Sequence, residues 1–299
     1  MCGIVGLFLK NRALEPKLGN MLAGMLGTMC ERGPDSAGFA IYGAGDTDHV
    51  KLTVRAPSGN YDFDRLAGLV AERIGAPVKV EHHDTHAVFT VSASVEAPPR
   101  EAIAALDQGV KVVSTGTRME IYKEVGRPDL VAKRFDLSHM AGSHGIGHTR
   151  MATESAVTID GAHPFSTGRD QCLVHNGSLS NHNALRRKLI RKGLSFETEN
   201  DTEVAAGYLT WRMGEGKSLG EALESSLDDL DGFYTFVVGT ESGFGVLRDP
   251  IACKHAVLAE TDDYVAFGTE YRALAGLPGI EKARVWEAEP ATVYFWERH

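Results

Sequence analysis

The pattern of hydrophobic and polar positions distinguishes the two outer parts of the chain from a middle segment. Near the start, the apolar run over 2–9 predicts a buried strand, apolar residues at helical spacing predict a helix over 15–31, and FAIYG predicts a second strand. Beyond residue 145 we expect the strands GIGHTRM and QCLVHNG. The remaining expected elements are helices near 180–192, 202–213 and 218–230, and strands at 233–240, 244–248, 255–259, 264–268 and 290–296.

The middle segment, residues 50–116, alternates strands and helices in the order β-α-β-β-α-β. HVKLTVRA, PVKVEHHD, HAVFTVSAS and VKVVSTGT resemble strands, whereas FDRLAGLVAERIG and PREAIAALDQG resemble helices. This order is typical of the ferredoxin-like fold. A further strand is expected at 118–125 and a helix at 127–134. The predicted domains are therefore a host of residues 2–49 and 136–299 and an inserted α/β module of residues 50–135.

The composition excludes several classes of partner. With 31 basic and 40 acidic residues the net charge is −9, so we expect neither nucleic acid nor an anionic membrane as partner. No stretch reaches the roughly 18 consecutive apolar residues of a membrane span, and MCGIVGLFLK lacks the leading positive charge of a secretory signal. The four cysteines are scattered, which favours a cytoplasmic location. The group HHDTH at 82–86 falls in an expected turn, and we predict no metal site there.

Cys2 follows the initiator methionine, and removal of Met1 would leave a thiol and an α-amine on one terminal residue. The amine titrates near ~8 and the thiol near ~8.5, so the amine is suited to act as general base for its own thiol. Taken alone, however, a cysteine at this position is more simply a small buried apolar residue. The other motifs have to decide between the two interpretations.

Arg150 lies in GHTRMAT, where strand geometry would place it on the same face as His148. An arginine held there is able to bind a carboxylate through two parallel hydrogen bonds. Thr153, just beyond the strand, offers a hydroxyl. The alternative is an ordinary surface arginine in a salt bridge.

Two further motifs carry polar groups beside predicted element ends. Asn176 and Gly177 follow the strand CLV, and Asn-Gly is a common signal for a hairpin turn. The segment after it, SLSNHNALRRKL, does not resemble a returning strand, which weakens the hairpin interpretation. An amide side chain beside a glycine N–H is suited to stabilising an oxyanion. Asp201 is expected to cap a helix, with Glu203 in its first turn. A carboxylate there would also be able to pair with a substrate ammonium.

Together these residues offer the groups needed to hydrolyse an amino-acid amide. At this point the sequence resembles the class II glutamine amidotransferases, which are hydrolases with an N-terminal nucleophile. The resemblance covers about 1–45 and 140–275. It rests on Cys-Gly-Ile at 2–4, R-G-x-D-S-A-G at 32–38, H-T-R-x-A-T at 148–153, A-H-P at 162–164, H-N-G at 175–177 and D-T-E-V at 201–204.

The resemblance implies an α+β fold with four layers, αββα, and the reaction of glutamine with water to give glutamate and ammonia. Cys2 would attack the side-chain amide, and Asn176 with Gly177 would stabilise the tetrahedral intermediate. The implied substrate-binding residues are Arg150, Thr153, His163 and Asp201. Met151 departs from the bulky aromatic residue that some members have at this position.

The long insertion and the string HTRMATES most resemble the glutaminase-type subunit of glutamate-synthase-like complexes, in particular N-methylglutamate synthase. This resemblance implies a separate synthase subunit as partner, with FMN and an iron–sulfur centre as cofactors to expect on partner subunits. The chain itself has no dinucleotide fingerprint, P-loop or cysteine cluster, and we expect no cofactor on it. A stand-alone hydrolase of γ-glutamyl amides and a catalytically silent scaffold subunit remain as alternatives.

Overall fold

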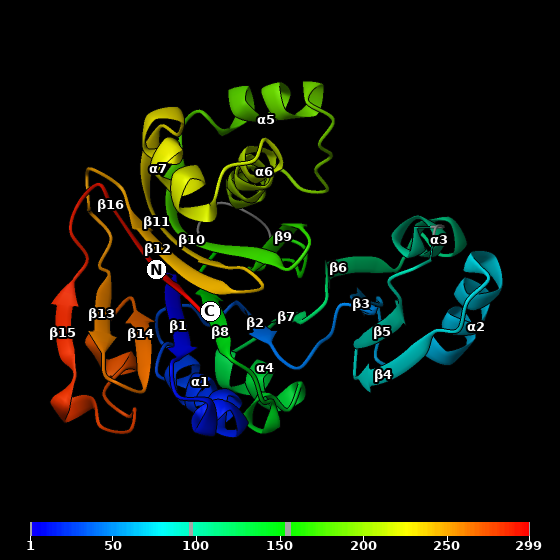
Figure 1. Cartoon of the computed structure of the whole chain (residues 1–299), viewed down its shortest axis with the longest axis horizontal. Helices are drawn as coiled ribbons and strands as arrows, with labels where there is room; N and C mark the ends of the chain where they lie inside the picture. Colours follow the sequence, from blue (N-terminus) through cyan, green and yellow to red (C-terminus); the bar gives the residue numbers. More distant parts are fainter. Residues whose placement is uncertain (1, 96–97, 153–156, 299) are drawn as a thin grey trace.

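The computed structural model of the chain describes residues 2–95, 98–152 and 157–298. Its larger part contains two antiparallel sheets (Figure 1). The first sheet has the order β15-β13-β14-β1-β8-β2-β7, so that β1 lies at its centre between β14 and β8. Its strands are β1 (Gly3–Leu9), β2 (Ser36–Tyr42), β7 (Met119–Val125), β8 (His144–Arg150), β13 (Val257–Glu260), β14 (Tyr264–Gly268) and β15 (Arg284–Glu287).

The second sheet has the order β16-β12-β11-β10-β9 and packs face to face with the first. A cluster of buried apolar side chains from both sheets, including Ile4, Ile146, Val174 and Phe244, fills the space between them. Strands buried on both faces need apolar residues at every position, which explains the continuous apolar runs of β1 and β2. The strands of the second sheet are β9 (Phe165–Gly168), β10 (Gln171–Leu179), β11 (Gly232–Gly239), β12 (Gly243–Arg248) and β16 (Thr292–Glu297).

Helices cover the outer faces of both sheets (Figure 1). Helices α1 (Leu18–Gly27) and α4 (Pro128–Arg134) pack on the seven-stranded sheet, and α5 (His182–Arg191), α6 (Asp201–Gly214) and α7 (Leu219–Asp229) pack on the five-stranded sheet. Helix α7 begins with a capping box in which Ser218 and Glu221 exchange hydrogen bonds. Short 3₁₀ turns lie at Arg12–Lys17, Leu137–His139, Tyr271–Ala273 and Ile280–Lys282.

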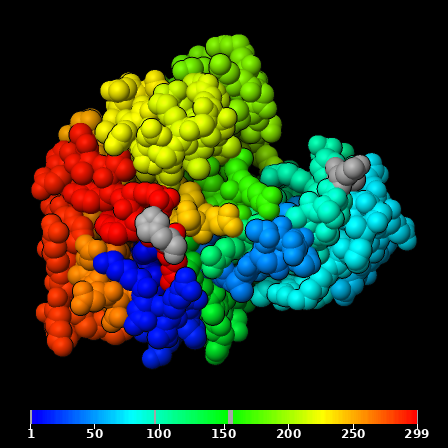
Figure 2. All heavy atoms as spheres, viewed as in Figure 1, coloured from blue at the N-terminus to red at the C-terminus, as the bar shows by residue number. Residues whose placement is uncertain are grey.

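A third, four-stranded sheet projects to one side of this core (Figures 1 and 2). Its strands have the order β4-β5-β3-β6, all paired antiparallel, and two helices pack against it around a separate apolar cluster. The predicted order β-α-β-β-α-β is confirmed. The elements are β3 (His49–Arg55), α2 (Phe63–Ile74), β4 (Lys79–His83), β5 (His86–Ser92), α3 (Pro99–Leu106) and β6 (Lys111–Gly116).

Residues 119–134, which we expected inside the insertion of residues 50–135, lie with the host elements instead. β7 pairs with β2 along its whole length, and α4 packs against α1. The prediction of the insertion's end was wrong because the local pattern marks a strand at 118–125 but does not show which sheet it joins.

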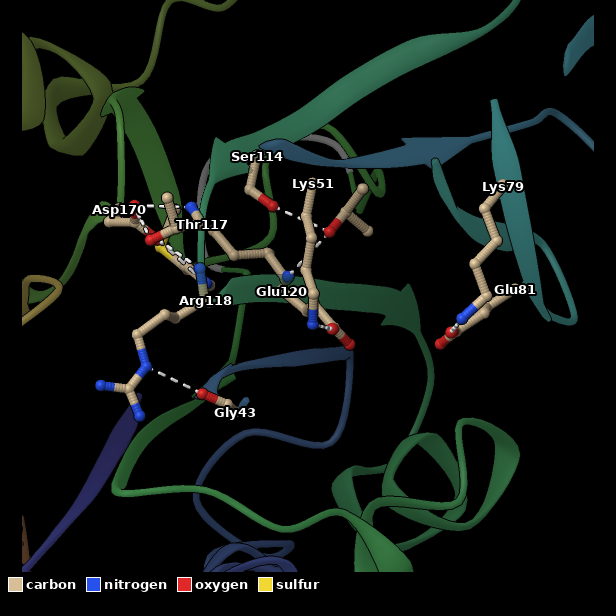
Figure 3. A network of polar contacts seen from close by, with 12 residues as sticks. Gly43, Lys51, Lys79, Glu81, Ser114, Thr117, Arg118, Glu120 and Asp170 are labelled. Atoms are coloured by element: carbon tan, nitrogen blue, oxygen red, sulfur yellow. Dashed lines mark hydrogen bonds and ion pairs between the residues drawn. The ribbon is translucent and has the colours of Figure 1, made fainter. Parts of the chain in front are cut away.

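Buried polar contacts join the projecting sheet to the core (Figure 3). The Asp170 carboxylate, in the turn between β9 and β10, accepts hydrogen bonds from the backbone N–H groups of Thr117, Arg118 and Met119 at 2.7–3.0 Å. Lys51 Nζ on β3 donates to Glu120 on β7 at 2.7 Å. The link between β6 and β7 is therefore attached to the turn that precedes β10.

Two expectations about local structure need correction, and one alternative is excluded. The expected helix over 15–31 is a 3₁₀ turn followed by α1, which ends at Gly27. The short strands β9 and β15 were not predicted, since each has only four residues. Asn-Gly at 176–177 forms no hairpin, because β10 runs through it to Leu179.

Candidate active site

Cys2 lies directly before β1 and carries a partly exposed thiol that forms no disulfide. Its carbonyl oxygen accepts hydrogen bonds from Arg32 Nε at 3.1 Å and from Asn176 Nδ2 at 3.4 Å. Arg32 comes from the turn before β2, and Asn176 comes from β10 of the other sheet. The backbone of Cys2 is thus held from both sheets.

Arg150 lies across from Cys2. β1 and β8 pair antiparallel with Gly3 opposite Thr149, and Cys2 and Arg150 are the residues adjacent to this last pair. The Arg150 side chain is half-buried, and its Nη1 lies 3.0 Å from where a Cβ on Gly161 would stand. A side chain at 161 would therefore crowd the guanidinium, which would have to shift by a few tenths of an ångström.

The turn with the sequence RGPDSAG fixes the backbone around Arg150. The N–H of Asp35 donates to the Arg150 carbonyl at 3.1 Å, and the Asp35 carboxylate accepts from the N–H of Ala152 at 2.8 Å. Ser36 is paired with Arg150 in the ladder between β2 and β8. The turn thus positions the end of β8 beside Cys2.

Asn176 is 6% exposed, and its Nδ2 also donates to Thr269 Oγ1 at 3.2 Å. Thr269 in turn accepts from the N–H of Ile4 at 2.8 Å. Within the described residues Asn176 Oδ1 has no hydrogen-bond partner although it is buried. The Asn176 amide nitrogen is therefore held next to the Cys2 backbone, whereas its amide oxygen has no partner among the described residues.

Gly177 has φ +149°, a conformation that residues with side chains rarely adopt. A Cβ there would lie 1.9 Å from the Phe233 carbonyl, so only glycine fits. Amide groups two residues apart on a strand point to the same edge, and the N–H of Leu179 donates to Asp201 Oδ2 at 2.9 Å. This places the N–H of Gly177 on the edge that faces the start of α6.

Asp201 is the first residue of α6 but not its N-cap, which corrects the prediction. Asn200 caps the helix, with its Oδ1 accepting from the N–H of Thr202 at 2.8 Å. The Asp201 carboxylate binds the N–H of Leu179 and lies 3.7 Å from His175 Nδ1. Its side chain is 23% exposed, so one part of the carboxylate faces solvent.

Three buried histidines lie behind these groups. The rings of His163 and His148 are in contact, with centroids 4.0 Å apart and planes tilted by 51°, and His148 Nε2 donates to the His175 carbonyl at 3.2 Å. Burial lowers the pKa of His148 to about 3, lowers the pKa of His163 well below its usual range, and lowers the pKa of His175. All three are therefore neutral at pH 7. The carbonyl of His163 packs on Gly38, where a Cβ would lie 2.2 Å from that oxygen.

Contacts that the sequence analysis did not anticipate complete the site. Glu270 binds Arg32, and its other oxygen binds Arg272 Nε at 2.6 Å. Burial raises the pKa of the Glu270 carboxyl, but the adjacent Arg32 and Arg272 guanidinium groups together lower it by more, and the pKa of Glu270 lies below its usual value. Thr269 and Glu270 directly follow β14, in the string FGTE. The pairing of β14 with β1 brings them close to Cys2, and no local pattern in the sequence indicates this pairing.

Two predicted features lie outside the described residues: Thr153 and the state of Met1. Among the residues that the structure does describe, no three His, Cys, Asp or Glu side chains are grouped to hold a metal ion. Over the same ranges, no helix has the length and apolar character to cross a bilayer. The histidines of HHDTH lie at the ends of β4 and β5, on either side of a turn.

Among solved structures, a glutamine amidotransferase has a similar fold. The glutamine phosphoribosylpyrophosphate amidotransferase of B. subtilis aligns with a TM-score of 0.61 and 20% identity, over 99% of this chain and 47% of that one. At this identity the likeness concerns the fold. It defines the class of α+β architecture to which the chain belongs.

Comparisons of sequence are more specific. Residues 148–276 match the family model described as a glutamine amidotransferase domain. The chain is 63% identical over 297 residues to the glutamine amidotransferase-like protein GlxB of Rhizobium meliloti (strain 1021), covering 99% of this chain and 98% of that protein. It is 34% identical to a putative glutamine amidotransferase of Methanothermobacter thermautotrophicus, covering 99% and 100% of the two chains. The chain belongs to the class II glutamine amidotransferase family.

Proposed function

We propose that this chain is the glutaminase subunit of a glutamine amidotransferase and hydrolyses glutamine through Cys2. Removal of Met1 exposes the α-amine, which takes the proton of the Cys2 thiol. The thiolate attacks the side-chain amide carbon, and the amine returns the proton to the departing ammonia. Water then cleaves the thioester and releases glutamate. The observation that carries the proposal is the contact of the Asn176 amide with the Cys2 carbonyl, because a side-chain amide held beside the nucleophile is suited to stabilising an oxyanion.

The remaining residues of the family motifs bind the substrate in this proposal. Arg150, which follows the last residue pair between β1 and β8, holds the α-carboxylate through two parallel hydrogen bonds. Asp201, whose carboxylate is partly exposed, pairs with the α-ammonium. The Gly177 N–H joins Asn176 in the oxyanion hole, and Thr153 and His163 complete the pocket.

The same proposal extends to the architecture. The two facing sheets with helices on both outer faces support a four-layer αββα fold of the N-terminal-nucleophile type. The four-stranded sheet with its two helices supports a ferredoxin-like insertion, for which we propose the boundaries 49–116 in place of 50–135. The host domain then consists of residues 2–48 and 117–299.

We further propose that the ammonia passes to a separate subunit of the glutamate-synthase or N-methylglutamate synthase kind in the cytoplasm. FMN, and with it an iron–sulfur centre, belongs to such partner subunits rather than to this chain. The relatives' names, which include the word amidotransferase, support nitrogen transfer. An apolar groove of about 640 Å³ supports a docked partner, since it lies beside Arg32 and Thr269 and is lined by Val257, Val285 and Trp286.

Glutamine turnover by the purified chain, alone and with a co-expressed synthase subunit, tests the proposal. We expect low activity alone and a rise with the partner, because the partner's ligand would have to favour the competent state of the glutaminase. Full activity on larger γ-glutamyl amides without any partner would instead identify a stand-alone hydrolase. Absence of glutamine hydrolysis under both conditions would identify a silent scaffold subunit.

A further inference from the structure

A cavity of about 360 Å³ lies between the four-stranded sheet and the core, away from Cys2. Strands β3 and β6 of the projecting sheet form one wall, and β7, β9 and the loop after α5 form the other. Figure 2 shows the projecting part beside the segment that follows α5. The volume is within the range of pockets that hold small molecules, roughly 300–1,000 Å³.

Two of the cations in this cavity are buried and keep unused donors. Lys123 is 7% exposed, and its Nζ donates to the Ala162 carbonyl at 3.0 Å and lies 4.7 Å from the centre of the Phe165 ring. Burial lowers the pKa of this lysine to about 8. Arg55 is 8% exposed, and its Nε has no hydrogen-bond partner in the described part of the chain. Such donors are costly to bury unless a ligand or water accepts from them.

The carboxylates of the cavity are already engaged. Glu203 accepts hydrogen bonds from the N–H groups of Glu197 and Thr198 at 2.8 Å each and from the Thr198 hydroxyl at 2.7 Å. Asp160 binds a terminal nitrogen of Arg55. The third acid, Glu197, is paired with Arg100 at 3.4 Å. None of the three contacts Lys123 directly.

Lys111 is a further basic group of the lining, in addition to Arg55, Arg100 and Lys123. It lies at the start of β6, is half-buried, and has no ion pair or hydrogen bond from its ammonium to any residue that the structure describes. The three acids act on the Lys123 charge from a distance, but neither Lys111 nor Lys123 forms an ion pair with a residue that the structure describes. Four basic and three acidic side chains line the cavity, so its lining carries a net positive charge. An anion is the complement that such a site lacks.

We propose that this cavity binds the oxyanion group of a small metabolite, a carboxylate or a phosphate, through Lys111, Lys123 and Arg55. Binding is coupled to the glutaminase site through Lys123, because its present acceptor, the Ala162 carbonyl, directly precedes His163. An anion that attracts the ammonium weakens the bond to Ala162 and alters the position of the His163 segment. This coupling rests on the proposed glutaminase function, whereas binding itself does not.

Titration calorimetry on the full chain at constant ionic strength tests the site, with inorganic phosphate and succinate as separate probes and sodium chloride as the reference. We expect saturable binding of one of the two, and the probe that binds identifies the oxyanion. Loss of a charged donor should weaken it about tenfold or more in Lys123→Met and in Lys111→Gln. Lys111→Gln changes a half-buried side chain and keeps the test valid if Lys123→Met folds poorly. Lys79→Gln, an exposed lysine on the same sheet, is the matched control and should bind as the parent chain does.

Absence of saturable binding of both probes, or an equal loss in Lys79→Gln, would overturn the site. Coupling is measured as the KM for glutamine with and without the saturating probe. We expect a change in the parent chain that disappears in Lys123→Met. Saturable binding that leaves this KM unaltered would overturn the coupling, and a chain without glutaminase activity would refute the proposed function while leaving the calorimetric result to decide the site.

Discussion

Replacement of Asp170 by asparagine should destabilise the chain strongly although the side chain keeps its shape. Asp170 is 2% exposed and has φ +51°, a left-handed conformation that asparagine tolerates as well as aspartate. Its carboxylate accepts four hydrogen bonds (Figure 3). The donors are Thr117 N at 2.7 Å, Thr117 Oγ1 at 3.0 Å, Arg118 N at 2.9 Å and Met119 N at 3.0 Å.

The size of the destabilisation depends on which carboxylate oxygen of Asp170 the new NH₂ group replaces. Oδ1 accepts from Arg118 and Met119, and an asparagine oxygen is able to keep both bonds. The new NH₂ would then face the N–H of Thr117, which is buried and would lose Asp170 as its acceptor (Figure 3). An unsatisfied buried N–H costs about 1–3 kcal/mol, and loss of the charge weakens the two remaining bonds. We expect the free energy of unfolding to fall by about 2–4 kcal/mol.

Equilibrium unfolding in urea, followed by circular dichroism, measures this change. Asp136→Asn is the matched control, since Asp136 has φ +55° but is exposed, and its effect should stay within about 0.5 kcal/mol. An Asp170→Asn variant as stable as the parent chain would refute the reasoning. An equal loss in Asp136→Asn would assign the effect to the left-handed backbone rather than to the carboxylate.

Further predictions concern acid stability and the catalytic residues. Burial lowers the pKa of His86, His144 and His148 to about 3. In the unfolded chain their pKa is ~6.5, so between about pH 6 and 4 the unfolded chain binds protons that the folded chain does not. The free energy of unfolding should fall by up to about 4 kcal/mol per pH unit between pH 6 and 4, and an unchanged urea midpoint over this window would contradict the prediction. Asn176→Ala should lower kcat about 10²–10³-fold, and Arg150→Ala should chiefly raise KM; equal effects on both parameters in both variants would contradict the assigned roles.

Local sequence patterns predicted the elements whose signal is local. The projecting sheet has short connections and complete apolar faces on its helices, so its order could be read directly from residues 50–116. The membership of β7 could not, because it depends on pairing with β2, which is more than 75 residues earlier in the chain for each pair. Strands as short as β9 and β15 contain too few positions for an alternation to stand out.

The candidate site shows the same division. Cys2, Arg150 and Asn176 could be named from their motifs, and the structure brings them together at one end of β1. Thr269 and Glu270 could not, since Thr269 reaches the N–H of Ile4 across 265 residues of chain and Glu270 reaches Arg32 across 238. Their contribution is positional, and no local pattern encodes it.

The most direct test of the account is glutamine hydrolysis by the purified chain and its Cys2→Ala variant, with the intact mass of each recorded. Cys30→Ala is the matched control: Cys30 is half-buried beside Asp129, and burial raises the pKa of its thiol. The account predicts that the active chain lacks Met1, that Cys2→Ala forms no glutamate, and that Cys30→Ala retains activity. Undiminished hydrolysis by Cys2→Ala, or by a chain that keeps Met1, would contradict it.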